Sequence, residues 1–156
     1  MSQIPITVRV QAEPFDTEAE VARLTAGRTD VGAVVTFAGL CRAEGGTLAA
    51  LELEHYPGMA EAEIVRVAEE AARRWPVMGL TAIHRFGRIA PGAPIVLVVA
   101  TSSHRHAAFE AAAFLMDFLK TRAPFWKKEH RADGTEGGWV DAREADDAAA
   151  ARWGGA

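Results

Sequence analysis

An apolar helical run that ends at a proline constrains the fold of this chain more than any other feature. Apolar side chains recur at helical spacing from residue 103 to residue 121, so this stretch predicts one long helix. Pro124 prevents the helix from continuing. Lys120 closes the apolar run, and Lys127 follows the proline. The chain therefore bends between two lysines that are seven residues apart.

The composition suits one soluble domain that spans residues 1–156 and has a substantial core, because 49% of the residues are hydrophobic and 24% are charged. The net charge of −4 argues against a nucleic-acid binder, which usually carries excess positive charge. No apolar run approaches the roughly 20 residues that span a bilayer, so no membrane contact is expected. A single cysteine, Cys41, excludes an internal disulfide and suits the reducing cytoplasm.

Hydrophobic periodicity and turn residues divide the chain into strands and helices. The expected strands cover residues 4–10, 32–39, 48–55, 81–86 and 95–101, and the one at 32–39 has the pattern of a buried strand. The expected helices cover residues 17–24, 60–75, 103–121 and 145–153, with Ser102 or Ser103 as the cap of the third. A short hairpin pairs residues 126–130 with 139–141. This order predicts an α+β fold, or an α/β fold with a mixed sheet.

The bend at Pro124 can bring the ammonium groups of Lys120 and Lys127 to one point, which seven residues of straight strand would not do. A neutral amine is a nucleophile or a base, and a charged neighbour can hold a carboxylate or a phosphate. The pair therefore indicates amine chemistry on an anionic substrate. The alternative is a solvated basic turn.

Arg105 and Lys120 lie on one face of the expected helix but at its two ends. Their separation along the helix is roughly 22 Å, so one small ligand cannot touch both. If both cations serve one site, a second copy of the chain must supply one of them, and the site lies at a dimer interface. The alternative is a surface helix whose cationic ends reach into solvent.

Two further segments carry candidate contacts. Arg42 follows an expected strand in a glycine-bounded loop, where its forked guanidinium group can grip phosphate. Cys41 beside it fits a small buried hydrophobe better than a catalytic thiol. His104 and Arg105, at the start of the long helix, can contact an anion together with free backbone N–H groups. No metal-ligand set, phosphate-binding glycine loop or cofactor motif is present, so no metal or cofactor is expected.

Six segments, in this order, resemble the large, catalytic subunit of molybdopterin synthase. The resemblance runs from about residue 32 to residue 153. It is carried by Val34-Val35-Thr36-Phe37-Ala38-Gly39-Leu40-Cys41-Arg42, Leu53-Glu54-His55-Tyr56-Pro57-Gly58-Met59, Ile83-His84-Arg85-Phe86-Gly87, Ser103-His104-Arg105, the run from Met116 to Glu129, and Trp139-Val140-Asp141-Ala142-Arg143.

The resemblance implies a hammerhead-type α/β fold and a central homodimer. It also implies a small ubiquitin-like carrier subunit at each end, which gives a heterotetramer. The carrier's C-terminal Gly-Gly bears a thiocarboxylate and enters a pocket of the large subunit. Sulfur then passes to cyclic pyranopterin monophosphate, and two transfers form the dithiolene of molybdopterin.

The resemblance also implies the roles of site residues. Lys120 and Lys127 match the family's two active-site lysines. Matches to substrate contacts are Leu40, Cys41, Arg42, His104, Arg105, Lys128, Glu129 and Arg143, in addition to the two lysines. His104 and Arg105 are expected to be donated across the dimer.

Two other functions fit the same residues. One is a lysine-dependent Schiff-base enzyme that acts on a phosphorylated carbonyl compound, with Lys120 as the reactive amine. The other is a scaffold that binds the carrier without catalysis. Sulfur transfer is the leading hypothesis because the resemblance implies it, and the acidic balance of the chain with a local cationic pocket agrees with a small anionic substrate.

Overall fold

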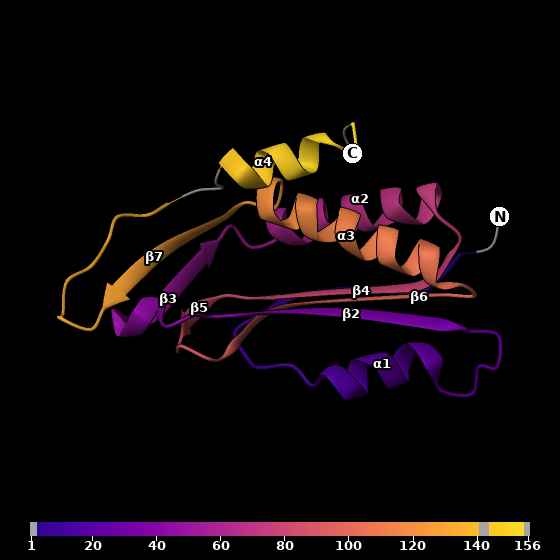
Figure 1. Cartoon of the computed structure of the whole chain (residues 1–156), viewed down its shortest axis with the longest axis horizontal. Coiled ribbons are helices and arrows are strands. Elements are labelled where there is room, and N and C mark those ends of the chain that lie inside the picture. The colour runs from indigo at the N-terminus through magenta and orange to yellow at the C-terminus, as the bar shows by residue number, and fades with distance from the viewer. Residues whose placement is uncertain (1–2, 141–143, 155–156) are drawn as a thin grey trace.

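The strands form two sheets in the computed structural model, which describes residues 3–140 and 144–154 (Figure 1). The first sheet has the order β1-β4-β6-β2, and its strands are Ile6–Gln11, Val77–Arg85, Pro94–Ser102 and Ala33–Leu40. β1 is parallel to β4, and the other pairs are antiparallel. The second sheet is antiparallel with the order β5-β3-β7, and its strands are Gly87–Ile89, Leu48–His55 and Phe125–Arg131. The expected α+β class with a mixed sheet is confirmed.

Helices cover both faces of the four-stranded sheet (Figure 1). α2 (Met59–Arg74) and α3 (Arg105–Thr121) lie on one face, and α1 (Thr17–Thr25) lies on the other. α4 (Glu144–Ala151) packs on α3, and a short 3₁₀ helix, η1 (Glu44–Gly46), precedes β3. No helix in the described ranges is long and apolar enough to cross a membrane.

The alternation of side chains along β6 divides the core into two layers. Val98 faces α2 and α3, where it joins the largest buried cluster together with Phe114 and Phe118. Val99, on the opposite face of the strand, packs with Leu24 of α1. A third cluster lies in the three-stranded sheet around the buried side chains of Cys41, Leu48, Leu53 and Ile89. The continuous apolar run of β6 thus reflects a strand that is covered on both faces.

Three local expectations are wrong. α3 begins at Arg105, and its N-cap is His104, whose extended backbone makes no side-chain capping bond, so neither serine caps this helix. β2 is an edge strand rather than a buried one, and Phe37 is 43% exposed on it. β4 begins four residues earlier than predicted, at Val77, directly after the proline that follows α2.

The expected hairpin near the C-terminus is confirmed over its described part. After β7 the chain turns back and forms isolated bridges from Lys127 to Val140 and from His130 to Glu136. The Gly137 N–H also donates to the carbonyl of Glu129 at 2.9 Å. The returning segment, residues 132–140, therefore lies along the outer edge of the three-stranded sheet.

Candidate functional site

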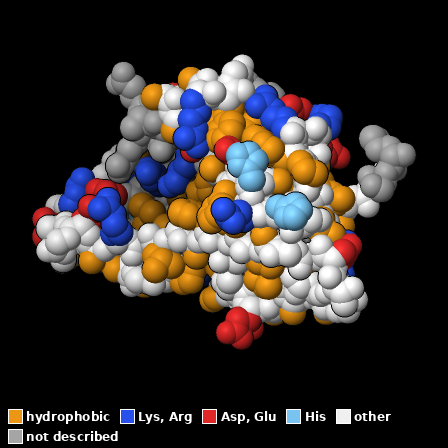
Figure 2. Space-filling model, turned by 45° about the vertical axis from the view of Figure 1, so that its right-hand side comes forward, with side chains coloured by type: hydrophobic (Ala, Val, Ile, Leu, Met, Phe, Trp, Pro, Cys, Tyr) orange, Lys and Arg blue, Asp and Glu red, His pale blue; other side chains and the backbone are white. Residues whose placement is uncertain are grey.

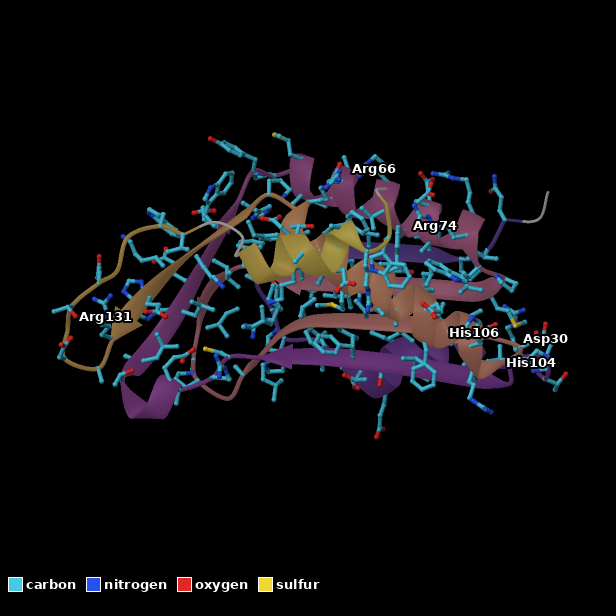
Figure 3. The ribbon with its side chains drawn as sticks, turned by 45° about the horizontal axis from the view of Figure 1, so that its top comes forward. Asp30, Arg66, Arg74, His104, His106 and Arg131 are labelled. Carbon is cyan, nitrogen blue, oxygen red and sulfur yellow. The ribbon has the colours of Figure 1, made fainter. Side chains whose placement is uncertain are left out.

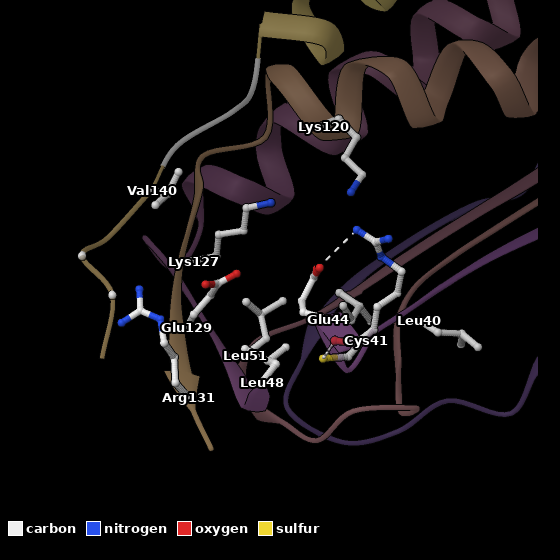
Figure 4. A pocket seen from close by; sticks show the side chains of 14 residues that line it. Leu40, Cys41, Glu44, Leu48, Leu51, Lys120, Lys127, Glu129, Arg131 and Val140 are labelled. Carbon is white, nitrogen blue, oxygen red and sulfur yellow. Dashed lines mark hydrogen bonds and ion pairs between the residues drawn. The ribbon is translucent and has the colours of Figure 1, made fainter. Parts of the chain in front are cut away.

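A cavity of about 430 Å³ lies where the end of α3, the loop after β2, and strands β3 and β7 meet (Figure 4). Its apolar floor includes Leu48 and Leu51. Four cationic and two acidic side chains line it, so the cations are in excess by two. These six are Arg42, Lys120, Lys127, Arg131, Glu44 and Glu129. Figure 2 shows lysine and arginine side chains around a hollow in the surface, with hydrophobic side chains beside it.

The proline bend brings Lys120 and Lys127 into this cavity, as the sequence predicts. Lys120 lies in the last turn of α3, and the Phe125 N–H donates to the carbonyl of Ala123 at 2.9 Å, which tightens the turn around Pro124. β7 begins at once and carries Lys127. Both ammonium groups point into the cavity in Figure 4. The two lysines thus line one cavity, although Lys120 is exposed to solvent.

Strand alternation separates Lys127 from Lys128. Lys127 and Glu129 line the cavity, whereas Lys128 lies on the opposite face of β7. There its ammonium group pairs with Glu136 at 3.4 Å and lies 5.0 Å from the centre of the Trp139 ring. The structure thus brings the predicted contact Glu129 to the cavity and does not bring Lys128 there.

The loop after β2 supplies the opposite wall. Leu40, Cys41 and Arg42 all line the cavity, and their contact with substrate stays a prediction. Arg42 is exposed and pairs with Glu44, with 3.3 Å between Nη2 and Oε1. Cys41 is only 3% exposed, and burial raises the pKa of its thiol. A buried thiol with a raised pKa is a poor nucleophile, which agrees with the structural interpretation of Cys41.

A second, smaller cavity of about 70 Å³ adjoins the first and shares Leu40, Ile95 and Lys120 with it. His84 of β4 lies in its wall. Burial is the main reason that the pKa of His84 falls to about 4 from its ordinary 6.5, and the charge of Lys120 lowers it further. No role in the site was predicted for His84 from the sequence. The sequence feature that could have indicated a buried His84 is the alternation of β4, which puts His84 on the same face as the buried Leu80 and Ala82.

His104 and Arg105 line a different pocket, of about 600 Å³, at the N-terminal end of α3. His104 and the cavity residue Arg131 lie at opposite ends of the molecule in Figure 3. One chain therefore does not bring His104 and Arg105 to the lysines, and their donation by a second copy stays a prediction. Arg143 lies outside the described residues. Within the part of the chain that the structure covers, no three His, Cys, Asp or Glu side chains group as a metal site.

The fold and this cavity define a protein with two lysine amines in one cavity whose lining carries an excess of cations. The chain belongs to the MoaE protein family, whose model matches residues 10–122. The molybdopterin synthase catalytic subunit of Mesorhizobium japonicum is 71% identical over 94% of this chain and 92% of its own length. The solved molybdopterin biosynthesis MoaE protein from Burkholderia ambifaria superposes with a TM-score of 0.82 and 51% identity over 96% of this chain and 98% of that one. Molybdopterin synthase from Staphylococcus aureus gives a TM-score of 0.73 and 31% identity over 88% and 98%. These likenesses confirm the expected fold and family.

Proposed function

We propose that this chain is the catalytic subunit of a molybdopterin synthase, which is a sulfurtransferase. It moves sulfur from the C-terminal thiocarboxylate of a small ubiquitin-like carrier to cyclic pyranopterin monophosphate, and two transfers form the dithiolene. The observation that carries this proposal is the convergence of Lys120 and Lys127 in one cationic cavity. The name of the Mesorhizobium relative, which is 71% identical, supports the same activity.

The charges of the cavity suit both reactants. The phosphate of the pterin and the thiocarboxylate of the carrier are anions, and the lining cations exceed the lining carboxylates by two. Arg42 offers phosphate a forked pair of N–H donors from the loop wall. In each transfer the acyl–sulfur bond of the carrier breaks, and water supplies the oxygen that turns the acyl carbon into a carboxylate. The sulfur bonds to a pterin side-chain carbon as a C–O bond of that carbon breaks, and the displaced oxygen stays with the phosphate or leaves as water. Lys120 and Lys127 stabilise the negative charge that develops in these steps.

We further propose that two copies pair and that a carrier binds each copy, which gives a heterotetramer. Exposed apolar side chains on the edge strand β2 support the pairing, because Val34 is 41%, Phe37 43% and Leu40 55% exposed. Phe109, on α3, is 59% exposed beside the pocket of His104 and Arg105. In the pair, His104 and Arg105 of one copy serve the lysine cavity of the other.

The remaining expectations complete the proposal. Residues 1–156 act as a single domain in the cytoplasm, where the single buried cysteine stays reduced. Lys120 and Lys127 act in catalysis. The residues proposed to contact substrate, besides the two lysines, are Leu40, Cys41, Arg42, His104, Arg105, Lys128, Glu129 and Arg143. For Lys128 the contact requires a carrier or second copy that reaches the outer face of β7.

One assay tests the activity. The chain is mixed with thiocarboxylated carrier and the pyranopterin precursor, and the fluorescent oxidised pterin product is measured. Carrier with an ordinary carboxylate tail is the control and gives no product. Lys120→Ala and Lys127→Ala are expected to bind the carrier normally and to lose product, which excludes a scaffold. Absence of product from the unmodified chain, together with borohydride trapping of a phosphorylated carbonyl compound on Lys120, would favour the Schiff-base alternative.

A further inference from the structure

His84 lies directly beneath the end of α3 that carries Lys120. It occupies the penultimate position of β4, paired with Val96 of β6, on the face of the sheet that α3 covers. His84 and Lys120 both line the 70 Å³ cavity, whose other walls include Met116 and Leu119. A cavity this small makes the two groups neighbours in surroundings that are otherwise mostly apolar.

The imidazole ring of His84 is held in one orientation. Its Nδ1 lies 2.8 Å from the backbone carbonyl oxygen of Arg85, and the ring stacks on Phe125 with 3.8 Å between centroids and 15° between planes. Because a carbonyl oxygen only accepts hydrogen bonds, Nδ1 carries the proton. The neutral ring therefore keeps its lone pair on Nε2, where it can accept a hydrogen bond.

The surroundings keep this ring neutral at physiological pH. Lys120 of α3 and His55 of β3 are the titratable groups that face it from neighbouring elements, and both disfavour a proton on the ring. Burial acts in the same direction and is the larger effect. His84 is thus a poor base for the amine of Lys120 but a permanent acceptor that adds no charge to the cavity.

We propose that His84 is a positioning residue for Lys120: the two side chains line one cavity without a hydrogen bond between them in this structure, and the Nε2 lone pair accepts one from the ammonium group when Lys120 turns toward the place where the two cavities join. The proposal rests on the function assigned above to Lys120. A lysine side chain is a flexible chain of four carbons. A hydrogen-bond acceptor near its ammonium group limits the positions that the positive charge can take. An uncharged acceptor does so without cancelling the positive charge that an anionic substrate requires.

Nitrogen NMR of the protein without carrier or substrate tests the geometry. The shifts of the two ring nitrogens are expected to show a protonated Nδ1 and an unprotonated Nε2 at pH 7. Lys120→Met is expected to raise the pKa of His84, because a repelling charge is lost. Lys128→Met, which removes a charge on the outer face of β7, is the matched control and leaves it unchanged. A protonated Nε2, or equal responses to the two variants, would overturn the proposal.

Sulfur-transfer kinetics test the role. His84→Phe keeps an aromatic ring that can stack on Phe125 but removes the hydrogen-bond acceptor Nε2. His84→Gln keeps a neutral hydrogen-bond acceptor. We expect His84→Phe to lower kcat about tenfold with little change in KM for the carrier, and His84→Gln to recover most of that loss. Equal activity of the two variants contradicts the proposal. If the unmodified chain transfers no sulfur, the proposed function fails, and the NMR result still decides where His84 and Lys120 lie.

Discussion

Lys127 and Val140 exchange two backbone hydrogen bonds, 3.0 Å from the Lys127 N–H to the Val140 carbonyl and 2.8 Å from the Val140 N–H to the Lys127 carbonyl. The returning segment therefore fixes the main chain of β7 at the residue whose side chain enters the cavity. Because the main chain is fixed on this side by Val140 and on the other by Leu53 of β3, the direction of the Lys127 side chain is set by the sheet.

Substitution of the adjacent lysines of β7 should have unequal effects. Lys127→Ala removes a cavity cation and is expected to lower kcat/KM for sulfur transfer by about 100-fold or more. Lys128→Ala removes an outer-face cation that pairs with Glu136 and whose proposed contact with a carrier or second copy is on the exposed surface, so the loss should stay within about threefold. The pterin-product assay measures both. Equal losses would show that β7 presents both side chains to the substrate.

Removal of one acidic charge should strengthen anion binding. Glu44→Gln releases Arg42 from its ion pair and raises the excess of cations in the cavity, so inorganic phosphate should bind about three- to tenfold more tightly at low salt. Titration calorimetry measures the change, which should shrink as salt is added. Glu136→Gln, on the outer face of β7, is the control. Unchanged affinity in Glu44→Gln would place the phosphate elsewhere.

The low pKa of His84 makes the folded state less stable in acid. The folded protein holds this group neutral down to a pKa of about 4, whereas the unfolded chain takes up the proton near 6.5. The unfolded state therefore binds more protons between these values, and the free energy of unfolding falls as pH drops through this window, by up to about 3 kcal/mol. Urea unfolding of His84→Phe between pH 7 and pH 4.5 should show a correspondingly smaller fall. An equal fall in both proteins would mean that His84 is not buried as a neutral ring.

An acidic side chain on the exposed edge strand should separate paired copies. Phe37→Glu places a charge among the exposed apolar residues of β2, so we expect the sedimentation coefficient to change from that of a dimer to that of a monomer with unchanged circular dichroism. Val65→Glu makes the same kind of change on α2, where Val65 is 36% exposed, and should leave the dimer intact. A monomeric unmodified protein would contradict the proposed pairing.

Local signals predicted most of the elements. The alternation of residues 48–55 matches β3 residue for residue, and Pro124 marks the end of α3 because the preceding residue cannot stay helical. β5 was missed because three residues are too short for a period to show. The order of the strands and the exposure of β2 depend on pairings between distant segments, which hydrophobic periodicity does not encode.

The candidate site also has one part that the local sequence predicts and another that depends on the fold. Lys120 and Lys127 were predictable as a pair because one proline joins them within a short segment. His84 and Lys120 are 36 residues apart in the sequence, and they line one cavity only because the fold places β4 beneath α3. His104 and Arg105 lie at the far end of α3 from the lysines, as the helical rise predicted.

The length of the short connection from Pro124 to Lys127 decides which face of β7 carries the Lys127 side chain. Inserting or deleting one residue here would turn the Lys127 side chain to the outer face of β7 and turn Trp126 or Lys128 toward the cavity instead. Inserting two would return Lys127 to the cavity face of β7 but move it about 7 Å along the strand. The length of this connection therefore sets both the face and the position of the Lys127 amine.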